Sequence, residues 1–79
     1  MIPLYGFLEG DTVGVLLLAE EHTSLAELAE RLQHSARLRV ARKAHVSIVH
    51  AGRPLDPRLT VKQANLTALE RIDVVERAS

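Results

Sequence analysis

The sequence predicts an α+β fold, in which one main helix packs across a mixed β-sheet, and a single domain over residues 1–79. Three observations predict it. Two apolar segments near the N-terminus read as strands on either side of a tight turn. A helix with a clear start signal follows them, and three short strand-like segments follow the helix. The expected order is therefore β-β-α-β-β-β, and a chain of 79 residues has room for one such domain.

The first two strands are expected at residues 2–8 and 12–19, joined by a turn around Gly10. A two-residue turn places Leu4 opposite Leu17. The hairpin then has one face with Leu4, Leu8, Val13, Val15 and Leu17 and another with Tyr5, Phe7, Leu16 and Leu18. A hairpin in a small domain normally buries one face and leaves the other to water. Since both faces are apolar here, we expect one of them to be covered by another protein or by neighbouring loops.

The helix is expected to start after Ser24, because Ser24 and Glu27 have the spacing of a capping box. It should end between His34 and Ala36. Its buried stripe, with apolar residues at i, i+3, i+4 and i+7, consists of Leu25, Leu28, Ala29 and Leu32.

The second half of the chain predicts strands at residues 46–50 and 71–76, with a short strand from Leu55 between them. Residues 51–54 are expected to form a turn, and residues 60–64 one turn of helix. The side chains expected to join the helix in the core are Ile48, Ile72 and Val74.

Charge is distributed in blocks along the chain, although the net charge is zero. Residues 1–30 hold six acidic residues and no Lys or Arg, whereas residues 31–55 hold six basic residues and no acid. Either these blocks interleave in space and cancel, or they give the domain a dipolar surface that orients it on a partner. The neutral balance, with only two aromatic residues, disfavours nucleic-acid binding.

Composition also bears on location. There is no cysteine, no basic residue precedes the first apolar stretch, and the longest apolar run, residues 13–19, is too short to span a bilayer. We therefore expect a cytoplasmic protein with no membrane contact.

The C-terminal half, VSIVHAGRPLDPRLTVKQANLTALERIDVV, resembles ubiquitin in its strand, Ala51-Gly52 turn and closing strand. The resemblance implies a ubiquitin-like β-grasp fold. Ubiquitin-type conjugation and sulfur carriage need a flexible C-terminal Gly-Gly, because only glycine threads the narrow channel of an activating enzyme. This sequence ends Glu76-Arg77-Ala78-Ser79, so we expect no activation of that kind.

Over nearly its whole length the chain also resembles the gamma, or B, subunit of toluene monooxygenase-type hydroxylases, which are bacterial multicomponent diiron enzymes. The residues that carry the resemblance are Ile2-Pro3-Leu4, Glu9-Gly10-Asp11, Leu16-Leu17-Leu18, Leu28-Ala29-Glu30-Arg31, Arg39-Val40-Ala41, Leu59-Thr60-Val61 and Ile72-Asp73-Val74-Val75. The resemblance implies a non-catalytic accessory subunit docked on the large catalytic subunit, which would hold the diiron centre. The alternative is a free-standing ubiquitin-like adaptor that binds other proteins.

The residues themselves predict no catalytic site, no metal site, no cofactor and no small-molecule substrate. The four histidines are dispersed, and His45 and His50 point to opposite faces of a strand. Glu30 and His34 share a helix face, but one pair is too few for a metal site. The helix also lacks the Glu-x-x-His motif of diiron carboxylate proteins.

The expected function is therefore protein binding through the outer face of the sheet. If Ile48 and Val74 point inward, Val49 and Val75 point outward, and these two positions match the apolar patch of ubiquitin. We expect Leu16 and Leu18, with Tyr5 and Phe7, to extend the patch, and Arg53 and Arg71 to ring it and select an acidic rim on the partner. The basic connector is expected to be a secondary contact through Arg37, Arg39, Arg42 and Lys43.

Overall fold

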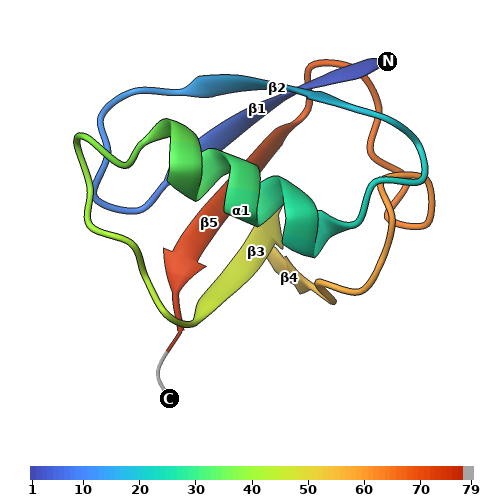
Figure 1. Cartoon of the computed structure of the whole chain (residues 1–79). Coiled ribbons are helices and arrows are strands. Elements are labelled where there is room, and N and C mark those ends of the chain that lie inside the picture. Colours follow the sequence, from blue (N-terminus) through green and yellow to red (C-terminus); the bar gives the residue numbers. More distant parts are fainter. Residues whose placement is uncertain (78–79) are drawn as a thin grey trace.

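The computed structural model describes residues 1–77, so the end of the chain at Ala78 and Ser79 lies outside the described residues. Figure 1 shows one helix lying across one face of a twisted sheet, as the sequence predicts. The elements are β1 (Ile2–Leu8), β2 (Val15–Ala19), α1 (Leu25–Ser35), β3 (Val46–His50), β4 (Arg53–Leu55) and β5 (Arg71–Glu76). No helix in residues 1–77 has the length and apolar character needed to cross a bilayer.

The five strands form one sheet in the order β2-β1-β5-β3-β4. β1 and β5 run parallel, and the other neighbouring pairs are antiparallel, which confirms the predicted mixed sheet. β5 is last in sequence, yet it lies in the middle of the sheet between the two hairpins (Figure 1). The two hairpins are therefore joined into one sheet by contacts between segments that are distant in sequence.

The hairpin register is the predicted one, because Leu4 pairs with Leu17 and both are buried. The second strand, however, begins at Val15 and not at residue 12. The carboxylate of Asp11 accepts a hydrogen bond of 3.2 Å from the Val13 N–H, so that the chain turns where the strand was expected. Val13 consequently lies outside the ladder and is exposed, and the prediction that it shares the buried face is wrong.

Helix α1 starts and ends where the sequence predicts. The Ser24 hydroxyl accepts a hydrogen bond of 3.1 Å from the Glu27 N–H, as an N-cap does. The predicted buried stripe is confirmed, because Leu25, Leu28, Ala29 and Leu32 are all almost inaccessible to solvent. The stripe packs on Ile48, Ile72 and Val74 of the sheet, which are also buried as predicted. Burial of each large aliphatic side chain contributes ~1.5–3 kcal/mol.

The loop from β4 to β5 covers the N-terminal end of α1. The Leu25 and Ala26 N–H groups, which have no partner within the helix, donate to the carbonyls of Leu59 and Pro57 at 2.8 and 2.9 Å. The predicted helical turn in this loop is a single one, closed by the Ala64 N–H and the Thr60 carbonyl at 2.9 Å.

The β3–β4 turn is tighter than the sequence predicts. Ala51 and Gly52 both have positive φ, 51° and 79°, as a two-residue type I′ hairpin turn requires. Pairing therefore resumes at Arg53, and β4 begins two residues before the predicted start at Leu55. Pro54 is tolerated within this strand because β4 lies at an edge of the sheet, where a missing N–H leaves no ladder bond unmade.

Candidate functional site

The face of the sheet opposite α1, which we call the outer face, holds most of the predicted binding residues. Strand alternation and the observed register decide which side chains lie there. The outer face consists of Leu16 and Leu18 on β2, Pro3, Tyr5 and Phe7 on β1, Arg71, Asp73 and Val75 on β5, Ser47 and Val49 on β3, and Pro54 on β4.

Four residues of the hairpin form the most exposed apolar area of this face, and we call them the hairpin cluster. Pro3 pairs with Leu18, and Tyr5 pairs with Leu16. The exposed fractions of Tyr5, Leu16 and Leu18 are 43%, 53% and 51%. Single exposed leucines are common, whereas three large apolar side chains on adjacent strands form a contiguous apolar area, a feature that in proteins generally is associated with interaction sites.

The centre of the outer face is polar. The Arg71 guanidinium lies over the Phe7 ring, 3.9 Å from the ring centroid. It also donates to the Asp73 carboxylate, with an Nη2–Oδ1 distance of 2.8 Å. The hydrogen bond to Asp73 raises the pKa of Arg71 above its ordinary value. Arg71 is expected at the rim with its charge available, whereas in the structure it lies in the middle of the outer face with Asp73 as its partner.

Val49 and Val75 lie together on the outer face but are half-buried. Val49 pairs with Asp73 on one side and with Pro54 on the other. The Arg71–Asp73 pair thus separates these valines from the hairpin cluster. Arg53 pairs with His50, so alternation directs its side chain to the opposite face, away from the two valines.

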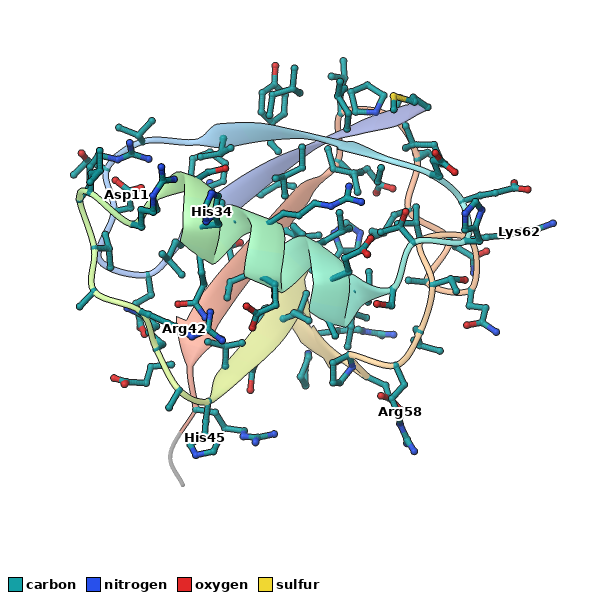
Figure 2. The ribbon with its side chains drawn as sticks, viewed as in Figure 1. Asp11, His34, Arg42, His45, Arg58 and Lys62 are labelled. Carbon is teal, nitrogen blue, oxygen red and sulfur yellow. The ribbon has the colours of Figure 1, made fainter. Side chains whose placement is uncertain are left out.

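The basic connector after α1 is tied to acidic residues of the N-terminal block. Arg39 donates to Asp11 from both Nε and Nη2, at 3.1 and 3.0 Å, and Arg42 binds Glu30 with two bonds of 2.7 Å. Figure 2 shows Asp11 beside the connector and Arg42 below α1. Each arginine lowers the pKa of its carboxylate partner. Here the acidic and basic blocks interleave in space and cancel, so that this part of the surface is not dipolar.

The other two predicted connector residues are placed differently. Arg37 donates to the His34 carbonyl at 2.8 Å and is exposed. Lys43 is held through its backbone, because its N–H donates to Gln33 Oε1 at 2.7 Å and its carbonyl accepts from Gln33 Nε2 at 3.1 Å. Gln33 is 4% exposed. Gln33 is not among the residues predicted from the sequence, although its position four residues after Ala29, on the buried stripe, is a signal that its amide needs a partner.

Metal ligands do not converge among residues 1–77, where no group of three His, Asp or Glu side chains is placed to hold an ion. His22 contacts Glu20 at 3.1 Å, and His50 contacts Glu70 at 3.2 Å. The carboxylate oxygens of Glu30, the acid nearest in pattern to a helix ligand, are both bound by Arg42. The residues that the structure describes therefore do not fit a diiron centre.

Comparison with solved structures shows the same fold in many other chains, and three of them illustrate the range. A chain of the toluene 4-monooxygenase HD complex with the inhibitor 4-bromobenzoate is 21% identical, with a TM-score of 0.87, covering 96% of this chain and 98% of that one. The ubiquitin of Caldiarchaeum subterraneum is 9% identical, with a TM-score of 0.80 and coverage of 99% and 95%. AtBAG1, in a complex with HSP70, is 12% identical, with a TM-score of 0.77 and coverage of 96% and 40%. The expected ubiquitin-like β-grasp is confirmed.

A search of curated protein sequences finds no match to this chain. A comparison with sequence families does find one. It covers residues 1–75, and the family is toluene-4-monooxygenase system protein B, TmoB. The match includes the helix, all of β1 to β4, and all but the last residue of β5. The chain therefore belongs to the toluene-4-monooxygenase system protein B family.

Proposed function

We propose that this chain is a cytoplasmic, non-catalytic accessory subunit that binds the large hydroxylase subunit of a bacterial multicomponent diiron monooxygenase. The observation that carries the proposal is the match to the toluene-4-monooxygenase system protein B family over residues 1–75. Under this proposal the diiron centre and the hydrocarbon substrate belong to the large subunit. The helix carboxylate of Glu30 is consistent with that assignment, because both of its oxygens accept hydrogen bonds from Arg42.

The hairpin cluster is the proposed main contact. Protein interfaces place large apolar and aromatic side chains at their centre and polar groups at the rim. Tyr5, Leu16 and Leu18 supply such side chains on adjacent strands, and the Arg71–Asp73 pair borders them. The valine pair, Val49 and Val75, would extend the contact on the far side of that border. Its half-buried side chains offer less area, so we rank it second.

The basic connector is the proposed secondary contact, chiefly through Arg37 and the side chain of Lys43. Arg39 and Arg42 already bind carboxylates of this chain. A partner carboxylate would have to displace Asp11 or Glu30 to reach them, which makes them weak sources of affinity.

The test is co-expression with the large hydroxylase subunit, followed by affinity purification and size-exclusion chromatography. The wild-type chain should elute with the large subunit. The double variant Leu16→Asp/Leu18→Asp should lose most of the complex, because it desolvates two charges in an apolar contact. Ala26→Asp is the control for an added carboxylate, since it places one of the same charged groups at an exposed position in the first turn of α1.

Two further outcomes assign the contact differently. If Val49→Asp/Val75→Asp removes the complex while Leu16→Asp/Leu18→Asp does not, the valine pair is the main contact. A wild-type chain that never elutes with the large subunit would contradict the proposal and support the free-standing adaptor. Circular dichroism of each variant confirms that the domain remains folded before any binding result is interpreted.

A further inference from the structure

The two edges of the sheet are protected very differently. At one edge, β4 is three residues long, contains Pro54 and is followed closely by Pro57. Short length and proline are the devices by which proteins prevent a foreign strand from pairing with an edge. At the other edge, β2 has five residues, VLLLA, with no proline and no charged side chain. The chain protects the β4 edge by length and proline, whereas the β2 edge carries neither device.

Two hydrogen bonds establish which way the β2 backbone faces. The Leu18 carbonyl accepts from Arg31 Nη1 on α1 at 3.0 Å, and the Glu20 N–H donates to Thr23 Oγ1 at 3.1 Å. These groups therefore point away from β1. Since backbone groups alternate along a strand, the N–H and carbonyl of Leu16 and the N–H of Leu18 point away as well. Among the described residues, no backbone group outside the sheet forms a hydrogen bond with the Leu16 N–H, the Leu16 carbonyl or the Leu18 N–H.

We infer that β2 is the acceptor edge for an extended segment of the partner, which adds a sixth strand to the sheet beside Leu16 and Leu18. This inference rests on the proposed function and specifies how that contact is made. The added strand pairs with the open groups of Leu16 and with the Leu18 N–H. Arg31 limits the pairing, because it already occupies the Leu18 carbonyl.

The surroundings of β2 define the chemistry of the added strand. On the outer face its side chains would lie next to Leu16 and Leu18, which favours apolar residues. On the side of α1 they would lie near the Arg31–Glu27 ion pair, whose Nη2–Oε2 distance is 2.8 Å, which favours polar residues. The segment we infer therefore alternates apolar and polar residues, as edge-recognition peptides do.

A second copy of this chain is a poorer occupant. Two β2 strands paired across a two-fold axis would extend the sheet sideways. That arrangement leaves the outward side chains of Tyr5, Leu16 and Leu18 exposed to water, since every helix and strand in residues 1–77 of each copy is already part of its own sheet and helix layer. A larger subunit can insert a strand at the edge and cover the adjacent face with the segments that follow it. The exposed face and the open edge therefore indicate the same larger partner.

The experiment compares Leu16→Pro with Leu16→Ala in binding to the large hydroxylase subunit, measured by isothermal titration calorimetry. Both variants remove the leucine side chain, but only proline also removes the outward N–H. Neither variant removes a hydrogen bond to β1, because the Leu16 N–H points away from that strand. We expect Leu16→Pro to bind about tenfold more weakly than Leu16→Ala, or weaker still. Equal affinities for the two variants would overturn the inference.

Hydrogen exchange of the wild-type chain provides a measurement that does not depend on a variant folding. In the free protein the amides of Leu16 and Leu18 should exchange quickly, and those of Val15 and Leu17, which face β1, slowly. In the complex the Leu16 and Leu18 amides should become protected at least tenfold. A complex that forms while these two amides exchange as in the free protein contradicts strand addition but leaves the proposed function intact.

Two other outcomes, the absence of any complex and self-association of the chain, would each overturn the inference. If no complex forms, the proposed function and this inference fail together. If Leu16 and Leu18 become protected in the chain alone as its concentration rises, with a dimer seen by analytical ultracentrifugation, then the edge serves a second copy and the inference is wrong.

Discussion

Phe7 has Arg71 above its ring and Gly14 against its edge. The guanidinium lies 3.9 Å from the ring centroid, and a Cβ on Gly14 would lie 2.7 Å from two ring carbons. The ring therefore fills a slot on the outer face that the glycine leaves open. Gly14 is required here for close approach and not for a special backbone angle, which makes this contact testable by substitution.

Gly14→Ala is expected to destabilise the domain by about 1–3 kcal/mol, because the added methyl group overlaps the Phe7 ring. The same substitution in a Phe7→Ala background should cost much less, since the obstructing ring is gone. Urea denaturation of the four proteins in this double-mutant cycle measures the coupling. Independent, additive effects would show that the ring moves aside without cost.

Leu28→Ala should unfold much of the population at room temperature. Leu28 is fully buried in the centre of the α1 stripe, and such truncations cost about 2–5 kcal/mol. A core of this size supplies only ~3–5 kcal/mol in total. Thermal unfolding followed by circular dichroism measures the effect. The control is Leu38→Ala, because Leu38 is 89% exposed and should change stability by less than about 0.5 kcal/mol.

Gln33→Leu is expected to cost about 1–3 kcal/mol, because it leaves the backbone N–H and carbonyl of Lys43 without their amide partner. The connector should loosen while the sheet stays intact. Hydrogen exchange distinguishes these effects, since the Lys43 amide should exchange faster and the Ile72 amide unchanged. Equal acceleration at both sites would mean that the substitution destabilises the whole domain and not the connector.

Stability should fall on acidification below about pH 4.5. Arg39 lowers the pKa of Asp11 below its ordinary value of 3.8, and Arg42 lowers the pKa of Glu30 below 4.5. The unfolded chain therefore binds protons at a higher pH than the folded one. The contribution is complete above the ordinary values and is lost as the pH falls through the lowered ones.

Urea denaturation at pH 7 and pH 3 measures this loss. Asp11→Asn should show a smaller difference between the two pH values than the wild type, because one of the linked carboxylates has been removed. A difference as large as that of the wild type would mean that the Asp11–Arg39 pair makes no pH-dependent contribution.

Local patterns were enough to predict that each helix and strand exists, but they missed the starts of β2 and β4. The bounds of β1, β3 and β5 and the N-cap at Ser24 follow from alternation and capping chemistry, and the structure confirms them. The start of β2 could not be predicted in this way. It depends on Asp11, which bonds the Val13 N–H and is held in place by Arg39, 28 positions further along the chain. No local pattern carries that contact.

The outer face was predicted only in part, again because its arrangement depends on contacts between segments that are distant in sequence. Alternation places Val49, Val75, Leu16 and Leu18 on one side of the sheet, but the order of strands decides what lies between them. Because β5 is inserted between β1 and β3, Arg71 and Asp73 fall in the middle of the face and form a pair there. Strand order depends on the whole fold, and sequence alternation does not contain it.

The central place of β5 in the sheet has a consequence for biosynthesis. Neither hairpin can join the other until β5 has been translated, because β1 and β3 make their ladder contacts to β5 and not to each other. At the usual rate of translation the N-terminal hairpin waits for seconds with one side of β1 unpaired. The domain must therefore fold after synthesis of Glu76, as one cooperative unit. Chaperone contacts during synthesis should be to the apolar hairpin.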